Sequence, residues 1–307
     1  MYSNDKPTDT LFRRAFKRFK NEIHVVDRDK EIIDFRLGTC VKDWDKLRHD
    51  KTFYITEADK RQLHINDPSD WLIYRNRNKP GLIVASNIFQ ESGHYFWGEK
   101  CLTDYICNPF RTNFDPKIKF ATSDDILENS NLIGRKLRWS ILGYDYDWDR
   151  KHYAQNRNNK FPENLRRLTT IIAQNLLNNQ NYRGESCLVN FYHAKSTLAG
   201  HVDHSELVHD QPIIAISFGQ PAIFLAGGST LDEIYPLAIK VYGGDVVIMD
   251  GEMRLAYHAV PKILKDEFKL VEEYSTTEHS GEKIRNFVID FINNHRINLS
   301  VRQVNPI

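Results

Sequence analysis

The sequence predicts a mainly β fold, an antiparallel barrel or jelly roll that follows a set of N-terminal helices. From about residue 135, short runs of β-branched and aromatic residues alternate with Gly, Pro and Asp turns. A single helical stretch, 162–179, interrupts these runs. Strands without intervening helices disfavour a βαβ sheet. The chain also has no G-x-G-x-x-G or P-loop pattern, which disfavours a nucleotide-cofactor fold.

Residues before this region have a different character. The turn sequence NRNKPG at 76–81 precedes an apolar run at 81–89 that predicts a strand, and 94–107 predicts a helix. The later strands are predicted at 137–148, 185–194, 213–219, 222–228, 236–242, 245–250, 284–290 and 296–304. We therefore divide the chain into a helical extension with a first strand (1–134), a hairpin and helix (135–184) and the β core (185–307).

Composition bounds the class of protein. Of the 307 residues, 41% are hydrophobic and 27% charged, enough to bury a core. Lys+Arg is 42 against Asp+Glu 41, so a nucleic-acid partner would meet a local basic patch rather than a generally basic surface. Four scattered cysteines without a CxxC pair, and the lack of a long apolar run, predict an intracellular protein with no membrane partner. Nucleus, mitochondrion and cytoplasm all remain open.

The segment LFRRAFKRFK at 11–20 predicts an amphipathic helix. Phe12, Phe16 and Phe19 fall on one helix face, and basic residues cover the rest. We expect a surface helix that packs its apolar stripe on the domain. A presequence or a nucleic-acid-binding arm is the alternative, although Asp5 and Asp9 disfavour a transit peptide.

The segment Gly200-His201-Val202-Asp203 carries a candidate metal site. On a strand, residues i and i+2 point to the same face, so His201 and Asp203 can present an imidazole and a carboxylate to one point. His258 supplies a third ligand. Two histidines and one carboxylate form the ligand set of non-haem Fe(II) and leave coordination positions open for O2. A bare H-x-D is a weak signal, because a lone histidine is more often a satisfied core residue.

The C-terminal run RINLSVR strengthens this interpretation. Arg296, Asn298, Ser300 and Arg302 share one face of the predicted strand. Buried guanidinium groups need anionic partners, and a dicarboxylate cosubstrate would provide them through bidentate hydrogen bonds. Two structural salt bridges with acidic loops are the alternative.

Together these motifs resemble the Fe(II)/2-oxoglutarate dioxygenase core of the AlkB family. GHVDHSEL, ISFGQPAIFLAGG, GGDVVIMDGEMRLAYHAVP and RINLSVRQ are most similar to its eukaryotic AlkB homologue 1 branch. The resemblance is close over about 135–307 and weaker before it. It implies a double-stranded β-helix (jelly-roll) core with N-terminal helices and a nucleotide-recognition lid in 135–184.

The resemblance also implies roles for individual residues. His201, Asp203 and His258 would bind Fe(II) and form the catalytic centre. Asn190 and Tyr192, in NFY, match the Asn-x-Tyr whose side chains touch 2-oxoglutarate. Arg296 would hold the distal carboxylate of 2-oxoglutarate, and Asn298 and Arg302 would complete its pocket near the metal. O2 is the second cosubstrate.

The substrate side is predicted from charge, aromatic residues and the family's lid. Residues 135–168 hold nine Lys/Arg against four Asp/Glu, with interleaved aromatic residues. Flipping a base into a buried site needs stacking platforms and phosphate contacts. We expect Tyr144 and Tyr146 to contact substrate. For Trp139 and Trp148, a packed hairpin with a solvated basic rim is an equal alternative.

Two departures from the bacterial repair members bear on substrate choice. Ser205 stands where those enzymes carry an acidic residue that contacts the alkylated base, and Ser229-Thr230 replaces a basic pair. The resemblance implies action mainly on tRNA, on 1-methyladenine or wobble 5-methylcytosine, and also on N6-methyladenine in unpaired DNA. We expect a monomer. An oxygenase of the same core acting on protein (histone) side chains is the rival function, and a binder with a dead metal site is poorly supported.

Overall fold

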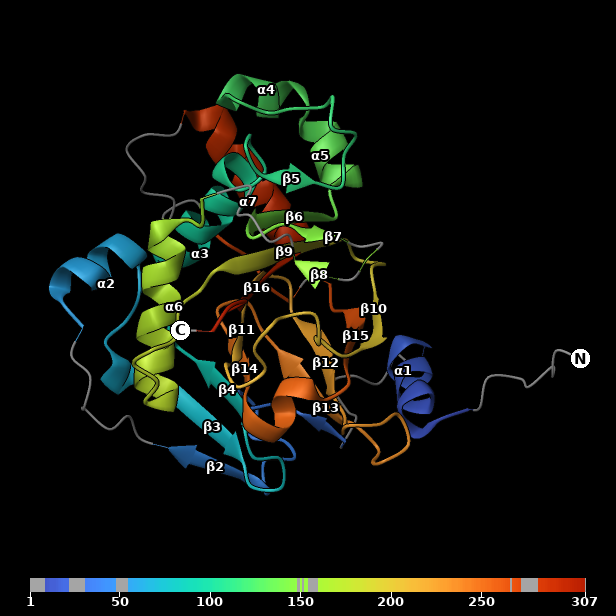
Figure 1. The fold of residues 1–307 in the computed structure, drawn as a ribbon. Helices are drawn as coiled ribbons and strands as arrows, with labels where there is room; N and C mark the ends of the chain where they lie inside the picture. Colours follow the sequence, from blue (N-terminus) through green and yellow to red (C-terminus); the bar gives the residue numbers. More distant parts are fainter. Residues whose placement is uncertain are drawn as a thin grey trace, which may run out of the picture.

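Two β-sheets form the frame of the molecule in this computed structural model (Figure 1). The larger sheet has nine strands in the order β2-β3-β4-β14-β11-β16-β9-β6-β5, and the smaller has five in the order β1-β13-β12-β15-β10. A third sheet is the two-stranded hairpin β7-β8. The structure describes residues 9–21, 31–47, 55–147, 150, 152–153, 160–265, 267–271 and 281–306.

The elements of the structure have the following bounds. The larger sheet contains β2 (Trp44–Leu47), β3 (Leu72–Asn76), β4 (Leu82–Ser86), β5 (Arg111–Thr112), β6 (Trp139–Gly143), β9 (Ser186–Tyr192), β11 (Ile213–Gly219), β14 (Val246–Met249) and β16 (Arg296–Arg302). The smaller sheet contains β1 (Ile32–Ile33), β10 (Leu198–His201), β12 (Ala222–Ala226), β13 (Leu237–Val241) and β15 (His258–Ile263), and the hairpin is β7 (Tyr146–Asp147) and β8 (His152–Tyr153). The helices are α1 (Leu11–Asn21), α2 (Glu57–Leu63), η2 (Pro68–Asp70), α3 (Glu91–Glu99), η3 (Lys100–Asp104), α4 (Ser123–Glu128), α5 (Ser130–Lys136), α6 (Glu163–Leu177), η4 (Gly251–Leu255) and α7 (Glu282–Asn294).

The apolar core lies on both faces of the larger sheet. One cluster joins inward side chains of the two sheets, such as Val84 and Val247 from the larger sheet and Ile239 from the smaller. A more extensive cluster lies under helices α3, α6 and α7, with Leu168 and Val288 fully buried. This arrangement confirms the predicted jelly roll: two facing sheets, with helices covering the larger one.

Most of the predicted strands are present. β9, β11, β12, β13, β14 and β16 fall within the predicted segments, as does β4 in the earlier part of the chain. The helix predicted at 162–179 is α6. β2 and β3, which sequence patterning missed among polar residues, pair with β4 in the larger sheet. The segment before residue 135 therefore contributes strands as well as helices to the frame.

The strand predicted at 284–290 is wrong, because these residues lie inside helix α7. The run contains aromatic and β-branched residues, which suggested a strand. However, the buried residues Ile284, Val288, Phe291 and Ile292 follow helical spacing, and they pack into the core under the larger sheet. Tertiary burial of a 3.6-residue stripe overrode β propensity here.

The strand predicted at 137–148 is interrupted. β6 ends at Gly143, whose φ of +80° is a left-handed conformation that favours glycine, and the chain then turns into β7. A Cβ at Gly143 would lie 2.0 Å from the carbonyl oxygen of Glu185. Trp148 lies outside the described residues.

Helix α1 packs on the smaller sheet, as expected for a surface helix. Phe12, Ala15 and Phe19 are buried, and the Phe12 ring lies 6.1 Å from that of Tyr257. Cβ atoms at Gly200 and Gly227 would lie 2.7 and 2.8 Å from the Phe12 ring, so only glycine lets the ring approach so closely. In the described part of the chain, no helix is both apolar enough and long enough to cross a bilayer.

Candidate active site

Two neighbouring strands of the smaller sheet place His201 and His258 side by side. His201 is the last residue of β10, His258 is the first of β15, and the two are direct partners in the antiparallel pairing. Their ring centroids lie 4.2 Å apart. Directly opposed residues of an antiparallel pair project to the same face, so the pairing alone brings the two imidazoles together.

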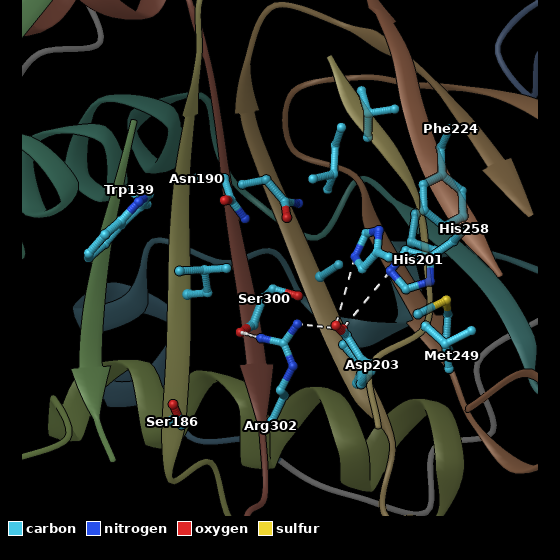
Figure 2. A pocket seen from close by; sticks show the side chains of 18 of the residues that line it. Trp139, Ser186, Asn190, His201, Asp203, Phe224, Met249, His258, Ser300 and Arg302 are labelled. Carbon is cyan, nitrogen blue, oxygen red and sulfur yellow. Dashed lines mark hydrogen bonds and ion pairs between the residues drawn. The ribbon is translucent and has the colours of Figure 1, made fainter. Parts of the chain in front are cut away.

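Asp203 completes the cluster from the loop after β10. Its two carboxylate oxygens lie 3.8 Å from Nε2 of His201 and 4.0 Å from Nε2 of His258 (Figure 2). We expected His201 and Asp203 on one strand, but β10 ends at His201. Among the described residues, these three side chains are the one set of three His, Cys, Asp or Glu whose ligand atoms all lie within 4.8 Å of one another.

Hydrogen bonds orient both imidazoles. Nδ1 of His201 lies 2.9 Å from the Ala199 carbonyl oxygen, and Nδ1 of His258 lies 3.1 Å from that of Ala256. A carbonyl accepts a hydrogen bond, so each Nδ1 carries the proton and each Nε2 presents a lone pair to Asp203. Such carbonyl contacts fix the tautomer that a metal ion needs.

Electrostatics favour a carboxylate at Asp203 and a neutral imidazole at His258. Burial opposes the charge on Asp203, but Arg302, His258 and His201 outweigh it and hold the pKa of the carboxyl well below its usual range. Burial, with His201 adding to it, lowers the pKa of His258 to about 4. At neutral pH Asp203 and His258 are therefore ready to bind a divalent cation without first losing protons.

The facing wall of the same cavity is built by β16 and β9. Arg296 pairs with Tyr192, Asn298 with Asn190, and Arg302 with Ser186 across these strands. All the residues that the sequence predicts for 2-oxoglutarate line this cavity of about 640 Å³ together with the metal cluster: Asn190, Tyr192, Arg296, Asn298 and Arg302. Figure 2 shows Asn190 and Arg302 on this wall.

Arg296 is a buried cation, and one of its N–H donors has no partner among the described residues. Its side chain is 4% exposed, and its guanidinium donates to the carbonyls of Gln220 and Val241 and to Oγ of Ser217 at 2.7 Å. Within the described residues its Nε has no hydrogen-bond partner. Because burying an unpaired charge is costly, the site fits an anionic ligand such as the carboxylate of 2-oxoglutarate.

The predicted substrate residues divide into two groups. Trp139, Tyr146 and Ser205 line the cavity, and the Tyr146 hydroxyl lies 3.0 Å from Oγ of Ser205. Tyr144 is not among the lining residues. Its backbone N–H donates to the Glu185 carbonyl at the turn after β6. Tyr153 of β8, one of the interleaved aromatic residues of 135–168, also lines the cavity.

A pair of buried charges beside the metal cluster was not predicted from the sequence. Glu206 and Arg254 form an ion pair at 2.9 Å, and their side chains are 2% and 1% exposed. Glu206 lies three residues after Asp203, and Arg254 lies four residues before His258. Opposite charges so close to two predicted metal ligands are the sequence signal that could have identified the pair. His204 and His209 are exposed, which fits a solvated loop rather than a second metal site.

Comparison with known proteins identifies the family. Residues 109–302 match the model of the 2OG-Fe(II) oxygenase superfamily. The nucleic acid dioxygenase ALKBH1 of Mus musculus is 34% identical over 224 residues, covering 68% of this chain and 57% of that protein. The DNA N(6)-methyladenine demethylase ALKBH1A of Arabidopsis thaliana is 30% identical, covering 98% of both chains. The chain belongs to the AlkB family of 2OG-Fe(II) oxygenases.

Other relatives of this AlkB-family chain have related names. The tRNA demethylase abh1 of Schizosaccharomyces pombe is 36% identical over 57% of this chain and 55% of its own length. A solved structure, that of OsALKBH1, matches with 20% identity and a TM-score of 0.48, covering 73% of this chain and 97% of the other. The match to mouse ALKBH1 spans only 57% of that protein's length.

The family implies Fe(II), 2-oxoglutarate and O2, and the residues of the AlkB-family chain fit this set. Two imidazoles and a carboxylate on one side of a metal ion are the ligand pattern of non-haem Fe(II). The buried Arg296, with its unpartnered Nε, supplies the complementary anion site across the cavity.

Proposed function

We propose that the chain is an Fe(II)- and 2-oxoglutarate-dependent dioxygenase that oxidises modified bases of nucleic acid, with tRNA as its main substrate and N6-methyladenine in unpaired DNA as a further one. One observation carries the proposal. A single cavity holds the His201, Asp203 and His258 cluster on one wall and Arg296 on the other, and Trp139 and Tyr146 flank it.

The printed names of the relatives support a nucleic-acid substrate. They include a nucleic acid dioxygenase, a tRNA demethylase and a DNA N(6)-methyladenine demethylase. The cavity adds a physical reason, because Trp139 and Tyr146 are aromatic residues at its wall and a base that leaves its stack needs an aromatic or apolar surface to replace its neighbours. As further parts of the proposal, the protein acts as a monomer, inside the cell, in the nucleus, mitochondrion or cytoplasm.

The residues have distinct roles in this reaction. His201, Asp203 and His258 would hold Fe(II), and with 2-oxoglutarate and O2 bound this group would supply the oxidising chemistry for a substrate C–H bond, with succinate and CO2 as the products of the cosubstrate. Arg296 anchors the far carboxylate of 2-oxoglutarate, and Asn190, Tyr192 and Asn298 line the path between this anchor and the metal cluster. Burial raises the pKa of Tyr192 to about 12, so its phenol stays protonated and can donate to the cosubstrate.

The test is an inventory of modified nucleosides. Total tRNA and methylated single-stranded DNA are incubated with wild type or with Asp203→Ala, and the digested nucleosides are quantified by mass spectrometry. We expect wild type to lower the amount of 1-methyladenosine, or to oxidise 5-methylcytidine, and to release a matching amount of succinate. Asp203→Ala should lose both outputs, because only two ligands remain.

Two results would contradict the proposal. If methylated nucleosides do not change while a histone peptide is oxidised, the substrate is protein and the rival function holds. If succinate release by Asp203→Ala equals that of wild type, the cluster does not hold the working metal. A matched control is Asp104→Ala, which removes an exposed carboxylate that pairs with Lys100 at 2.7 Å on the surface.

A further inference from the structure

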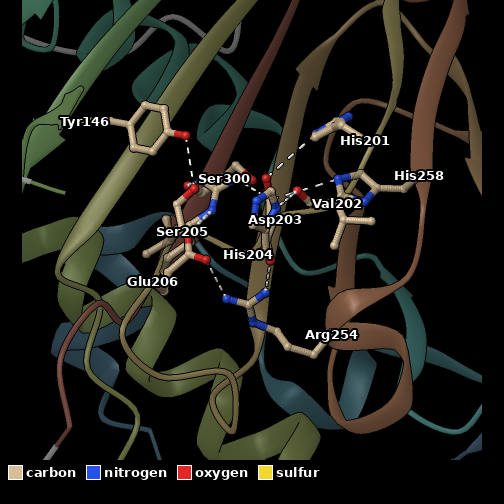
Figure 3. Close-up of polar contacts among 12 residues, drawn as sticks. Tyr146, His201, Val202, Asp203, His204, Ser205, Glu206, Arg254, His258 and Ser300 are labelled. Atoms are coloured by element: carbon tan, nitrogen blue, oxygen red, sulfur yellow. Dashed lines mark hydrogen bonds and ion pairs between the residues drawn. The ribbon is translucent and has the colours of Figure 1, made fainter. Parts of the chain in front are cut away.

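Glu206 lies at the centre of a buried polar network (Figure 3). One carboxylate oxygen accepts a hydrogen bond from Nη2 of Arg254 at 2.9 Å. The other accepts one from the Tyr153 hydroxyl at 2.9 Å and lies 3.2 Å from Nε of Arg302. The Glu206 side chain is only 2% exposed, so its charge is stabilised by these partners and not by water.

Both arginines that contact Glu206 also contact Asp203. Arg302 forms an ion pair with the Asp203 carboxylate, and Nη1 of Arg254 donates to the Asp203 main-chain carbonyl at 2.7 Å. Contacts therefore run in a closed ring from Asp203 through Arg302, Glu206 and Arg254 back to Asp203. Two cations face two anions, and removal of one member leaves its buried partners uncompensated.

The ring continues into the β7–β8 hairpin. Tyr153 of β8 donates to Glu206, and the Tyr146 hydroxyl of β7 hydrogen-bonds Oγ of Ser205, one residue before Glu206. The two tyrosine rings contact each other edge to face, with centroids 5.2 Å apart. Two adjacent residues of the loop after Asp203 thus hold both strands of the hairpin.

We propose that Glu206 is a positioning residue that couples the β7–β8 hairpin to Arg302, so that the hairpin and the 2-oxoglutarate pocket become ordered together. A role of the hairpin as a substrate lid rests on the proposed function. The coupling of the hairpin to Arg302 rests only on the contacts described above. In the described part of the chain, Glu206 forms no hydrogen bond or ion pair with the ligand atoms of the metal cluster, and it meets the cosubstrate wall at Arg302. It acts through Arg302, whose Nη2 meets Asp203, and through Tyr153.

Coupling of this kind is reciprocal, so it can be measured without any substrate. The full chain is loaded with Mn(II) as a stand-in for Fe(II), and 2-oxoglutarate is titrated by calorimetry. Amide exchange of the peptide containing β7 and β8 is followed with and without 2-oxoglutarate. In wild type, 2-oxoglutarate should slow exchange in this peptide.

Two variants test the two ends of the coupling. Glu206→Gln keeps the shape but removes the charge, and it should weaken 2-oxoglutarate binding about tenfold or more. Tyr153→Phe removes one hydroxyl, and it should weaken binding by about threefold to tenfold while abolishing the slowed exchange. In turnover assays both variants should raise the KM for 2-oxoglutarate more than they lower kcat.

Matched controls separate coupling from loss of fold. Glu185→Gln neutralises another buried glutamate, which accepts hydrogen bonds from the backbone of Val304 and Asn305. Tyr105→Phe removes another buried hydroxyl, one that donates to Asn164. Both controls should leave the affinity for 2-oxoglutarate within about twofold of wild type.

The outcomes decide the proposal in either direction. If Glu206→Gln and Tyr153→Phe bind 2-oxoglutarate as tightly as their controls, or if 2-oxoglutarate still protects the hairpin in Tyr153→Phe, the coupling is refuted. If Glu206→Gln does not fold, Tyr153→Phe alone decides, because it removes no charge. Failure of the proposed function would show separately, as normal binding and exchange with no change in any nucleoside.

Discussion

At the scale of single residues, the site depends on charges that are buried in advance of any ligand. Arg296 is held by two backbone carbonyls and by Ser217, which fixes the guanidinium before 2-oxoglutarate arrives. Preorganised donors cost no reorganisation on binding, so each of their contacts contributes more to affinity. The same logic applies to His201 and His258, whose Nδ1 atoms are already occupied by carbonyls.

Arg296→Ala tests this preorganisation. Loss of a charged hydrogen-bonding partner costs about 2–4 kcal/mol, which weakens 2-oxoglutarate binding roughly 30- to 1000-fold. Arg296→Lys should recover part of the affinity, because it keeps the charge but loses the planar fork. Calorimetric titration of the Mn(II)-loaded protein measures both. A change smaller than threefold in Arg296→Ala would remove Arg296 from the cosubstrate site, and Arg61→Ala, on the exposed face of α2, serves as control.

At the scale of elements, helix α1 supports the two histidine-bearing strands from outside the cavity. Phe12 packs on Gly200, which precedes His201, and on Tyr257, which precedes His258. A helix that sequence patterning describes only as amphipathic thus contacts both segments that carry metal-ligand candidates. Its packing and the geometry of the site are therefore not independent.

Gly200→Ala should disturb both the packing of helix α1 and the geometry of the metal-ligand cluster. Its Cβ would lie 2.7 Å from the Phe12 ring, so either α1 or β10 must shift, at a cost of about 1–3 kcal/mol in the free energy of unfolding. Urea unfolding and Mn(II) titration should show lower stability together with weaker metal binding. Gly134→Ala is the matched control, since no atom lies within 4 Å of its Cβ position.

The double variant Phe12→Ala/Gly200→Ala tests whether Gly200→Ala loses stability because its Cβ crowds the Phe12 ring. Phe12→Ala alone leaves a cavity and should cost about 3–5 kcal/mol. In the double variant the new methyl group occupies part of that cavity, so the two costs should not add. Strict additivity, or unchanged metal affinity in Gly200→Ala, would show that α1 does not support the metal-ligand strands.

At the scale of the whole molecule, the sequence predicted the jelly roll and the residues that meet in its cavity. Strand periodicity located β9, β11 and β16, and spacing along β16 placed Arg296 and Arg302 on one face. What it could not supply was pairing between distant segments. Helix α7 was mistaken for a strand because its stripe is apparent only once the sheet it covers is known.

The same limit applies within the site. Glu206 and Arg254 lie 48 residues apart, and only the fold brings their charges together. Tyr144 and Tyr146 are nearly adjacent in sequence, yet the turn after Gly143 leaves only Tyr146 in the cavity wall. Local pattern predicts which way a strand residue points, but not where a strand is broken.

The depth of the cavity predicts which nucleic acids are good substrates. His258 is 8% exposed, so on the proposed function we expect a paired base to leave its duplex before it reaches the metal cluster. Unpairing and unstacking cost a few kcal/mol and cost least in loops and single strands. We therefore expect matched methylated oligonucleotides to react faster as stem-loops or bulges than as perfect duplexes, as measured by single-turnover rates.

Among the aromatic residues predicted to contact substrate, Tyr146 lines the cavity and Tyr144 does not, so their substitutions should differ. Tyr146→Ala should slow oxidation of every nucleic acid, because stacking of a base on an aromatic ring contributes about 1–3 kcal/mol. Tyr144→Ala should have the smaller effect, since Tyr144 does not line the cavity. Binding of 2-oxoglutarate to Tyr144→Ala should match that of wild type. Equal rates on duplex and loop would mean that bases reach the site without flipping. A larger effect of Tyr144→Ala than of Tyr146→Ala would mean that the hairpin meets substrate in another arrangement.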